Sequence, residues 1–255
     1  MNGSFYEGLS KEHQQQSLED FKGKIQLNKD WRVDIAIYDA TVPVLHLDYI
    51  PKNIKCEITL CNGLGVVNSK LLAHLYAIQP KAVKFYHFIR LWLSCTEVEF
   101  KGYQLALLVL FFLQTRNFVP AMKKVQKNLI IKKVKGWPIQ FHENKSSQAY
   151  YLNPWVHFKK AVLRFFEYYG GFNYEANIIF TNLGIVVDKT SFAKRKSLKK
   201  YPKEKENFQM GTPMALAGPL SFDYNVAQDV SAKNLEKFKQ LCLSSSALLL
   251  PMKKI

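Results

Sequence analysis

Residues 103–114 have the sequence YQLALLVLFFLQ, in a chain of 255 residues. A helix built from this segment is apolar on every side, so the segment predicts a helix at the buried centre of a domain. Its apolar run, 105–113, is far shorter than the roughly 20 residues that cross a bilayer, and we expect no membrane partner. The remaining elements are therefore expected to pack around residues 103–114.

Apolar residues recur with the helical period of 3.6 on both sides of this segment. Residues 71–78 and 83–92 predict two helices that meet at Pro80, since proline is tolerated in the first turn of a helix. Further helices are predicted within 153–169 and at about 232–249. These helices should form the layer that covers residues 103–114.

Nearer the start of the chain, apolar residues alternate with period two, which is typical of strands. Residues 31–37, 41–47 and 54–60 predict three short strands, and Pro43 indicates that the middle one lies at a sheet edge, because proline cannot donate a ladder hydrogen bond. A further strand pair is predicted within 174–187. The order of strands, helices, a strand pair and a helix predicts an α+β fold.

The chain is strongly basic. Its 36 Lys and Arg residues outnumber 20 Asp and Glu residues, which gives a formal charge of +16 and favours polyanionic partners or an anionic surface. Charge alone does not choose between RNA, DNA and lipid. The four cysteines have no CxxC or zinc-ligand spacing, and the first residues show no secretory signal pattern. No P-loop, GxGxxG or Ser/His/Asp pattern is present. We expect a protein of the cytoplasm or nucleus.

Five segments, in order and unequally spaced, carry a resemblance to one family. They are 41–47 (TVPVLHL), 55–72 (KCEITLCNGLGVVNSKLL), 83–93, 101–114 and 219–226. They resemble the family motifs xVPIxKL, CDI(S/T) with NNxLAxxNTxLL, VKxWAK, LSSYxLxLMVIFFLQ and DPFExxHNV. The chain is identified as a divergent, N-terminally truncated member of the noncanonical poly(A) polymerases and terminal uridylyltransferases.

The resemblance implies two domains. Residues 1–60, with the strands in 31–60, would be the remnant of a nucleotidyltransferase palm sheet. Residues 61–255 would be a mainly helical, poly(A)-polymerase-like central domain, with the polymerase-associated region at about 150–225. In this family the 3′-hydroxyl of RNA attacks the α-phosphate of ATP or UTP. Two Mg²⁺ or Mn²⁺ ions, held by three carboxylates, assist the transfer.

Only the third of those acid positions is retained, as Glu57. The family's first two acids lie on a Gly-Ser turn followed by SDxD, which this sequence lacks, so the chain is expected to begin after the strand that carries them. Asp34 and Asp39 are the nearest other acids, but a separation of five puts them on opposite faces of a strand. Glu57 is thus the one candidate catalytic and metal-binding acid, and a purely structural or surface role is its alternative.

Five positions match the family's nucleotide contacts. Asn68 and Ser69 would contact ribose and phosphate, since both side chains can form hydrogen bonds. Tyr103 would stack on the base, unless it is a core aromatic. Arg90 replaces a triphosphate lysine and keeps its charge, whereas Ser94 replaces a second lysine and loses it. Nucleotide binding is therefore expected to be feeble.

In the base-reading motif, the family's Asp, Glu and His positions are occupied by Gly218, Ser221 and Tyr224. Without those polar groups, any preference between UTP and ATP should be weak. Asn225 is retained, and we expect it to serve packing rather than chemistry.

Two basic segments predict contacts with RNA phosphates, with Trp137 as a stacking ring in the first. The second also fits an unspecific nuclear-import signal. Solubilising charge on loops is the alternative for both. The residues are Lys132, Lys133 and Lys135, then Lys194, Arg195, Lys196, Lys199 and Lys200.

Three functions remain open, and whether the chain is an enzyme is open with them, because two metal-binding acids are absent. The first is a pseudoenzyme that binds RNA, and ATP or UTP weakly. The second is an active terminal uridylyl- or adenylyltransferase in RNA 3′-end processing, with its acids supplied by an upstream segment or by a second chain that completes the palm. The third is a protein-interaction scaffold.

Overall fold

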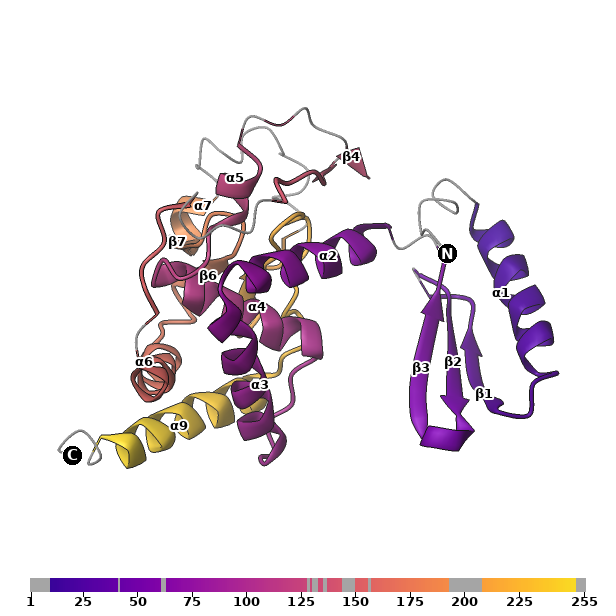
Figure 1. The fold of residues 1–255 in the computed structure, drawn as a ribbon, viewed down its shortest axis with the longest axis horizontal. Coiled ribbons are helices and arrows are strands. Elements are labelled where there is room, and N and C mark those ends of the chain that lie inside the picture. The colour runs from indigo at the N-terminus through magenta and orange to yellow at the C-terminus, as the bar shows by residue number, and fades with distance from the viewer. Residues whose placement is uncertain are drawn as a thin grey trace. The chain divides into compact units, whose positions relative to one another are not determined.

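The structure is a computed structural model with two compact units, Met1–Ser69 and Lys70–Ile255 (Figure 1). No described helix is both long enough and apolar enough to cross a membrane. The structure describes residues 10–40, 42–60, 63–127, 129, 133–134, 137–143, 150–155, 157–192 and 208–250.

Unit 1 is an antiparallel sheet packed against one helix. Leu18 of the helix is fully buried with Leu45 and Leu47 of the central strand, because apolar side chains alternate onto that face of the sheet. The three predicted strands are confirmed, and a helix precedes them. The elements are α1 (Lys11–Ile25), β1 (Trp31–Ile37), β2 (Val44–Tyr49), the 3₁₀ turn η2 (Ile50–Lys52) and β3 (Ile54–Thr59), with sheet order β1-β2-β3.

The prediction that Pro43 marks an edge strand is wrong. Strand β2 lies between β1 and β3, and it begins at Val44, one residue after the proline. The missing N–H of Pro43 therefore falls outside the ladder and costs no hydrogen bond. For the same reason the strand is shifted downstream of the predicted 41–47.

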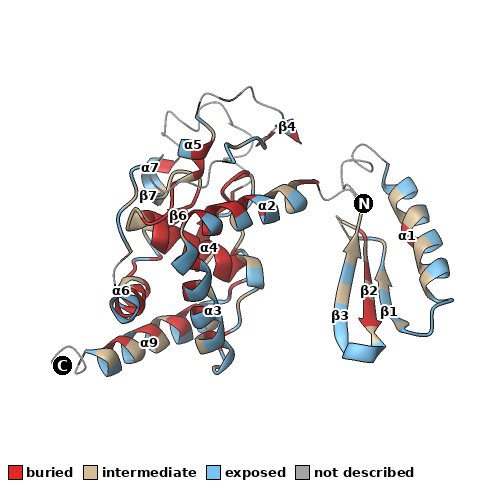
Figure 2. Cartoon of the chain, viewed as in Figure 1, coloured by how far each residue is buried: buried red, intermediate tan, exposed pale blue. Residues whose placement is uncertain are grey.

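Unit 2 is mainly helical, and α4 (Gly102–Thr115) is its central helix. Every residue from Gln104 to Gln114 is buried, as the sequence predicts (Figure 2). Phe112 of α4 lies between aromatic rings of two neighbouring helices, with centroids 5.8 Å from Phe85 and 5.4 Å from Phe165. The other helices are α3 (Pro80–Ser94), α5 (Met122–Val125), α6 (Phe158–Gly170), α7 (Lys189–Phe192) and α9 (Ala232–Leu249), with α2 (Gly63–Ile78) spanning the boundary between the units.

A small mixed sheet completes the described part of unit 2, along with the two-residue strands β4 (Lys133–Val134) and β5 (Trp137–Pro138). The predicted pair is confirmed as β6 (Asn177–Phe180) and β7 (Ile185–Asp188). A third strand, β8 (Ala215–Ala217), pairs parallel to β6 and was not predicted, because three residues show no periodicity. The α+β prediction is confirmed.

Candidate functional site

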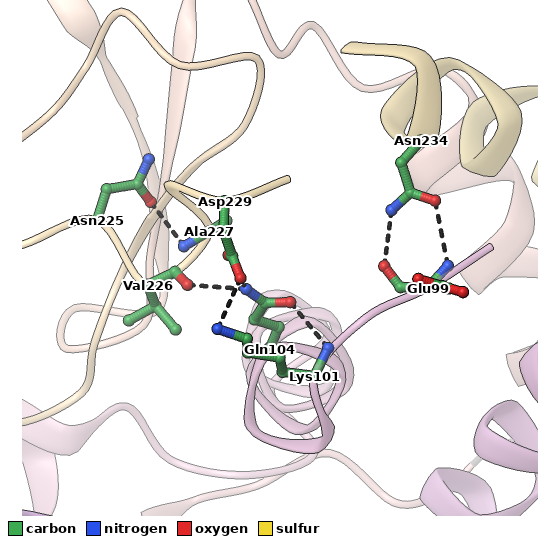
Figure 3. A network of polar contacts seen from close by, with 8 residues as sticks. All are labelled: Glu99, Lys101, Gln104, Asn225, Val226, Ala227, Asp229 and Asn234. Carbon is green, nitrogen blue, oxygen red and sulfur yellow. Dashed lines mark hydrogen bonds and ion pairs between the residues drawn. The ribbon is translucent and has the colours of Figure 1, made fainter. Parts of the chain in front are cut away.

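Polar contacts fasten the amino end of α4 to the segment 225–229 (Figure 3). The amide of Gln104, which is 2% exposed, donates to the Val226 carbonyl at 3.0 Å and to Asp229 Oδ1 at 2.6 Å. Its Oε1 accepts from the Lys101 N–H at 2.9 Å. Lys101 Nζ lies 2.7 Å from Asp229 Oδ2. We call these three side chains, Lys101, Gln104 and Asp229, the α4 clamp.

The clamp lowers the pKa of the Asp229 carboxyl group. The hydrogen bond from Lys101 lowers the pKa of Asp229, and the one from Gln104 acts in the same direction. Sequence reasoning missed the clamp. The available signal was Gln104 itself, a polar residue near the start of a helix that is otherwise apolar on every side.

Asn225 holds the neighbouring backbone in place. Its Oδ1 accepts from the N–H groups of Leu216 at 2.8 Å and Ala227 at 2.9 Å. Its Nδ2 donates to Thr212 Oγ1 at 2.6 Å, to the Met214 carbonyl at 2.7 Å and to a further backbone carbonyl. The side chain is fully buried. This bonding agrees with the packing role expected for Asn225.

Two tyrosines predicted for the site are sequence neighbours of these residues, Tyr103 before Gln104 and Tyr224 before Asn225. Tyr103 is partly exposed in the first turn of α4, and Tyr224 is 43% exposed. Burial raises the pKa of the Tyr103 hydroxyl well above its usual range, and the nearby Tyr224 phenol raises it further. Burial also raises the pKa of Tyr224, with Asp223 adding to the effect. The two phenol hydroxyls thus interact electrostatically, and we call Tyr103 and Tyr224 the tyrosine pair.

The other two positions of the base-reading motif lie just after β8. Ser221 is buried, and a Cβ on Gly218 would lie 2.6 Å from the Ser221 carbonyl oxygen. The Asn182 amide donates to the Pro219 carbonyl at 2.7 Å and ties this turn to the β6–β7 hairpin. The backbone around Gly218 thus leaves no room for the carboxylate that the resembled motif carries.

Arg90 and Ser94 lie four residues apart on the exposed surface of α3, so they share one face of that helix. Ser94 Oγ donates to the Leu91 carbonyl at 2.8 Å. Arg90 makes no hydrogen bond or ion pair with another described residue, which leaves its guanidinium available to a phosphate.

Asn68 and Ser69 lie on α2 within unit 1. Ser69 Oγ donates to the Gly65 carbonyl at 3.0 Å. Asn68 is 9% exposed, and its Oδ1 has no hydrogen-bond partner among the described residues. A buried acceptor without a partner is costly, so this amide is suited to a ligand or a water molecule.

Glu57 lies on β3 opposite His46 of β2, and its Oε1 is 3.6 Å from His46 Nδ1. Asp34 sits at a bulge in β1, and the fully exposed Asp39 faces Lys11 at 4.0 Å. Within the described ranges, no three His, Cys, Asp or Glu side chains gather where they could hold a metal ion. One glutamate and one imidazole do not fit a pair of Mg²⁺ or Mn²⁺ ions, which prefer several oxygen ligands each.

Of the predicted RNA-binding residues, Lys133 is exposed on β4. The prediction that Trp137 stacks on RNA is wrong, because its ring is 3% exposed and packs 4.5 Å from Phe222. The remaining predicted residues lie outside the described part of the chain: Lys132, Lys135, Lys194, Arg195, Lys196, Lys199 and Lys200.

A cleft of about 520 Å³ opens beside the α4 clamp. Lys237 on its wall lies 2.6 Å from Glu97, and Lys101 pairs with Asp229, so these charged side chains form pairs within the cleft. The Asn234 amide joins the wall to the Glu99 backbone by two hydrogen bonds (Figure 3). These contacts fix the loop that leads into α4.

Comparison with known proteins agrees with the resemblance. The chain is 26% identical over 233 residues to the "Speckle targeted PIP5K1A-regulated poly(A) polymerase" of Danio rerio, across 81% of this chain and 28% of that protein. It is 24% identical over 139 residues to human "Terminal uridylyltransferase 7", across 50% of this chain and 9% of that protein. No family model matches. The chain therefore spans well under half of these relatives.

The fold is also found among solved structures. The crystal structure of mtPAP in complex with GTP superposes with a TM-score of 0.78 at 17% identity, across 94% of this chain and 50% of that one. This likeness establishes the α+β nucleotidyltransferase fold. The homologues of this chain are thus poly(A) polymerases and terminal uridylyltransferases.

Proposed function

We propose that this homologue of poly(A) polymerases and terminal uridylyltransferases binds nucleotide and RNA 3′ ends without completing nucleotidyl transfer by itself. The observation that carries the proposal is a contrast within the described chain. Tyr103 lies in the first turn of α4 and interacts electrostatically with Tyr224, whereas Glu57 is the one acid at the three metal-binding positions of the resembled family.

The nucleotide-binding part of the proposal rests on three side chains whose chemistry suits a nucleotide. Tyr103 offers an aromatic ring to a base, and such stacking is worth roughly 1–3 kcal/mol. Arg90 offers a charged fork to phosphates. Asn68 offers a buried carbonyl oxygen with no partner from the described chain. Each of these groups could contribute to nucleotide affinity by itself, and discrimination between bases should be small because Gly218 and Ser221 bring no side-chain carboxylate.

The proposal that the chain does not catalyse transfer by itself rests on electrostatics. A two-metal transfer needs carboxylates that offset the repulsion between two divalent ions. Glu57 is 70% exposed, and its Oε1 lies 3.6 Å from His46 Nδ1. Within the described residues, this one carboxylate beside an imidazole supplies too few oxygen ligands for two divalent ions.

The test is a binding titration of the full chain with ATP and with UTP. Tyr103→Ala should weaken both affinities by roughly 5- to 150-fold through loss of stacking, while Tyr103→Phe should keep them near wild type. Arg90→Ala should weaken both, and Arg90→Lys should restore part of the loss. Equal affinities for wild type and Tyr103→Ala would refute the assignment of the tyrosine pair.

Location in the nucleus follows as a further part of the proposal. The Danio rerio relative is named as speckle targeted, which favours the nucleus over the cytoplasm for this chain. A fluorescent fusion of the full chain should concentrate in nuclei, and a uniformly cytoplasmic signal would contradict this part.

A further inference from the structure

The two outer strands of the unit 1 sheet differ in regularity. The β1 register shifts between Val33 and Ile35, and such a bulge protects an edge from pairing. Strand β3 pairs with β2 over six consecutive residues without a shift, and no described strand pairs with its outer side (Figure 1). Of these two edges, β3 is therefore the one suited to accept another strand.

The sequence of β3 is complementary to itself. When two copies run antiparallel and are centred on Cys56, Lys55 of each copy lies opposite Glu57 of the other. Ile54 of each copy lies opposite Ile58 of the other on the opposite face. One register thus forms two opposite-charge pairs and two apolar pairs, which are the pairs that stabilise antiparallel strands.

The charges already present on the sheet continue this pattern. On the face opposite α1, Arg32 of β1 lies 2.5 Å from Asp48 of β2, and Asp48 is the register partner of Lys55. In the paired arrangement, Lys55 of the first copy lies opposite Glu57 of the second copy. Within that second copy, Glu57 Oε1 lies 3.6 Å from His46 Nδ1. Charge therefore alternates along the row from one copy into the next, as Arg32, Asp48, Lys55 and Glu57.

We propose that two copies of this chain associate through β3 and form a continuous six-stranded antiparallel sheet. The twofold axis is perpendicular to the sheet, so α1 of both copies covers the same face. A second copy is the occupant because the β3 edge presents charges complementary to its own. Lys55 and the Glu57 side chain are both exposed and within reach of such a partner.

Charge reversal tests the register by sedimentation velocity or native mass spectrometry of the full chain. Wild type should dimerise with a concentration-dependent equilibrium. Lys55→Glu places two glutamates opposite each other, and Glu57→Lys places two lysines opposite each other, so each variant should raise the dimer dissociation constant by about tenfold or more. Lys52→Glu, which changes the net charge as Lys55→Glu does but lies in the turn η2, should leave the dissociation constant unchanged.

Mixing makes the test specific. An equal mixture of Lys55→Glu and Glu57→Lys pairs opposite charges at both positions and should form heterodimers, and the double reversal should dimerise with itself. A wild-type monomer at every concentration would overturn the proposal, and so would single variants that dimerise like wild type or a mixture that stays monomeric. A monomer whose outer β3 amides resist hydrogen exchange would show that a segment of the same chain covers the edge, which also overturns it.

Discussion

At the scale of single residues, the backbone around Gly218 explains why one lost acid cannot simply be replaced. A Cβ at Gly218 would lie 2.6 Å from the Ser221 carbonyl oxygen, so any side chain there requires the backbone to move. The Asn182 and Asn225 amides hold the surrounding segments by several hydrogen bonds. An aspartate introduced at position 218 would therefore displace the turn.

This geometry predicts that Gly218→Ala destabilises the chain by about 1–3 kcal/mol, the usual cost of overpacking. Urea unfolding measures the loss. Gly211→Ala is the matched control, because a Cβ at Gly211 meets nothing within 4 Å, and its effect should stay within about 0.5 kcal/mol. Equal stability of the two variants would show that the turn adjusts freely.

We expect replacement of Asn225 to lower the free energy of unfolding more than replacement of Gly218 does. Asn225→Ala leaves two buried N–H groups and their neighbouring carbonyls without the amide, so the free energy of unfolding should fall by about 3 kcal/mol or more. Gln228→Ala, at an exposed position three residues on, should change it by less than about 0.5 kcal/mol. Chemical denaturation followed by tryptophan fluorescence compares the two, and a small Asn225→Ala effect would contradict the bracing role.

At the scale of elements, the α4 clamp joins the central helix to the segment after β8. Because Gln104 contacts both Val226 and Asp229, removing it affects partners 122 and 125 positions away in sequence. We expect the double-mutant cycle of Gln104→Ala with Asp229→Ala to give a coupling of about 0.5–3 kcal/mol. The exposed Gln16–Asp20 hydrogen bond on α1 is the comparison pair, and its coupling should be about 0.2–0.5 kcal/mol.

The same clamp predicts a pH dependence. The pKa of Asp229 is lowered in the folded chain, so its contribution to stability is present above the unfolded value near pH 4 and is lost as pH falls through the lowered value. Asp229→Asn should flatten the acid side of the stability curve below about pH 4, by less than about 1 kcal/mol because the ion pair is partly exposed. Parallel curves for the two proteins would contradict the ion pair.

The sequence was informative where elements are long and periodic. Helix α4, helix α9 and the β6–β7 pair could be predicted because each carries its own pattern. The central position of β2 could not, since Pro43 lies one residue before the strand and a local rule does not show where a ladder begins. The α4 clamp could not be predicted from the sequence either, because Gln104 and Asp229 meet only after the chain folds.

At the scale of the whole molecule, the charge of +16 favours RNA over an uncharged partner. Affinity for a single-stranded RNA should fall steeply and linearly on a log–log plot as salt rises, since counterions are released on binding. Fluorescence anisotropy at several salt concentrations measures the slope. A protein-interaction scaffold would instead show no RNA affinity at moderate salt.

The central claim is that the chain binds nucleotide and RNA but lacks the acids for transfer. An RNA 3′-tailing assay with labelled ATP and UTP, in Mg²⁺ and in Mn²⁺, tests it most directly. We predict no extension by the purified wild-type chain at concentrations where both ligands are bound. Extension that Glu57→Ala abolishes would contradict the account, because it would mean that the acids missing from the described sheet are supplied after all.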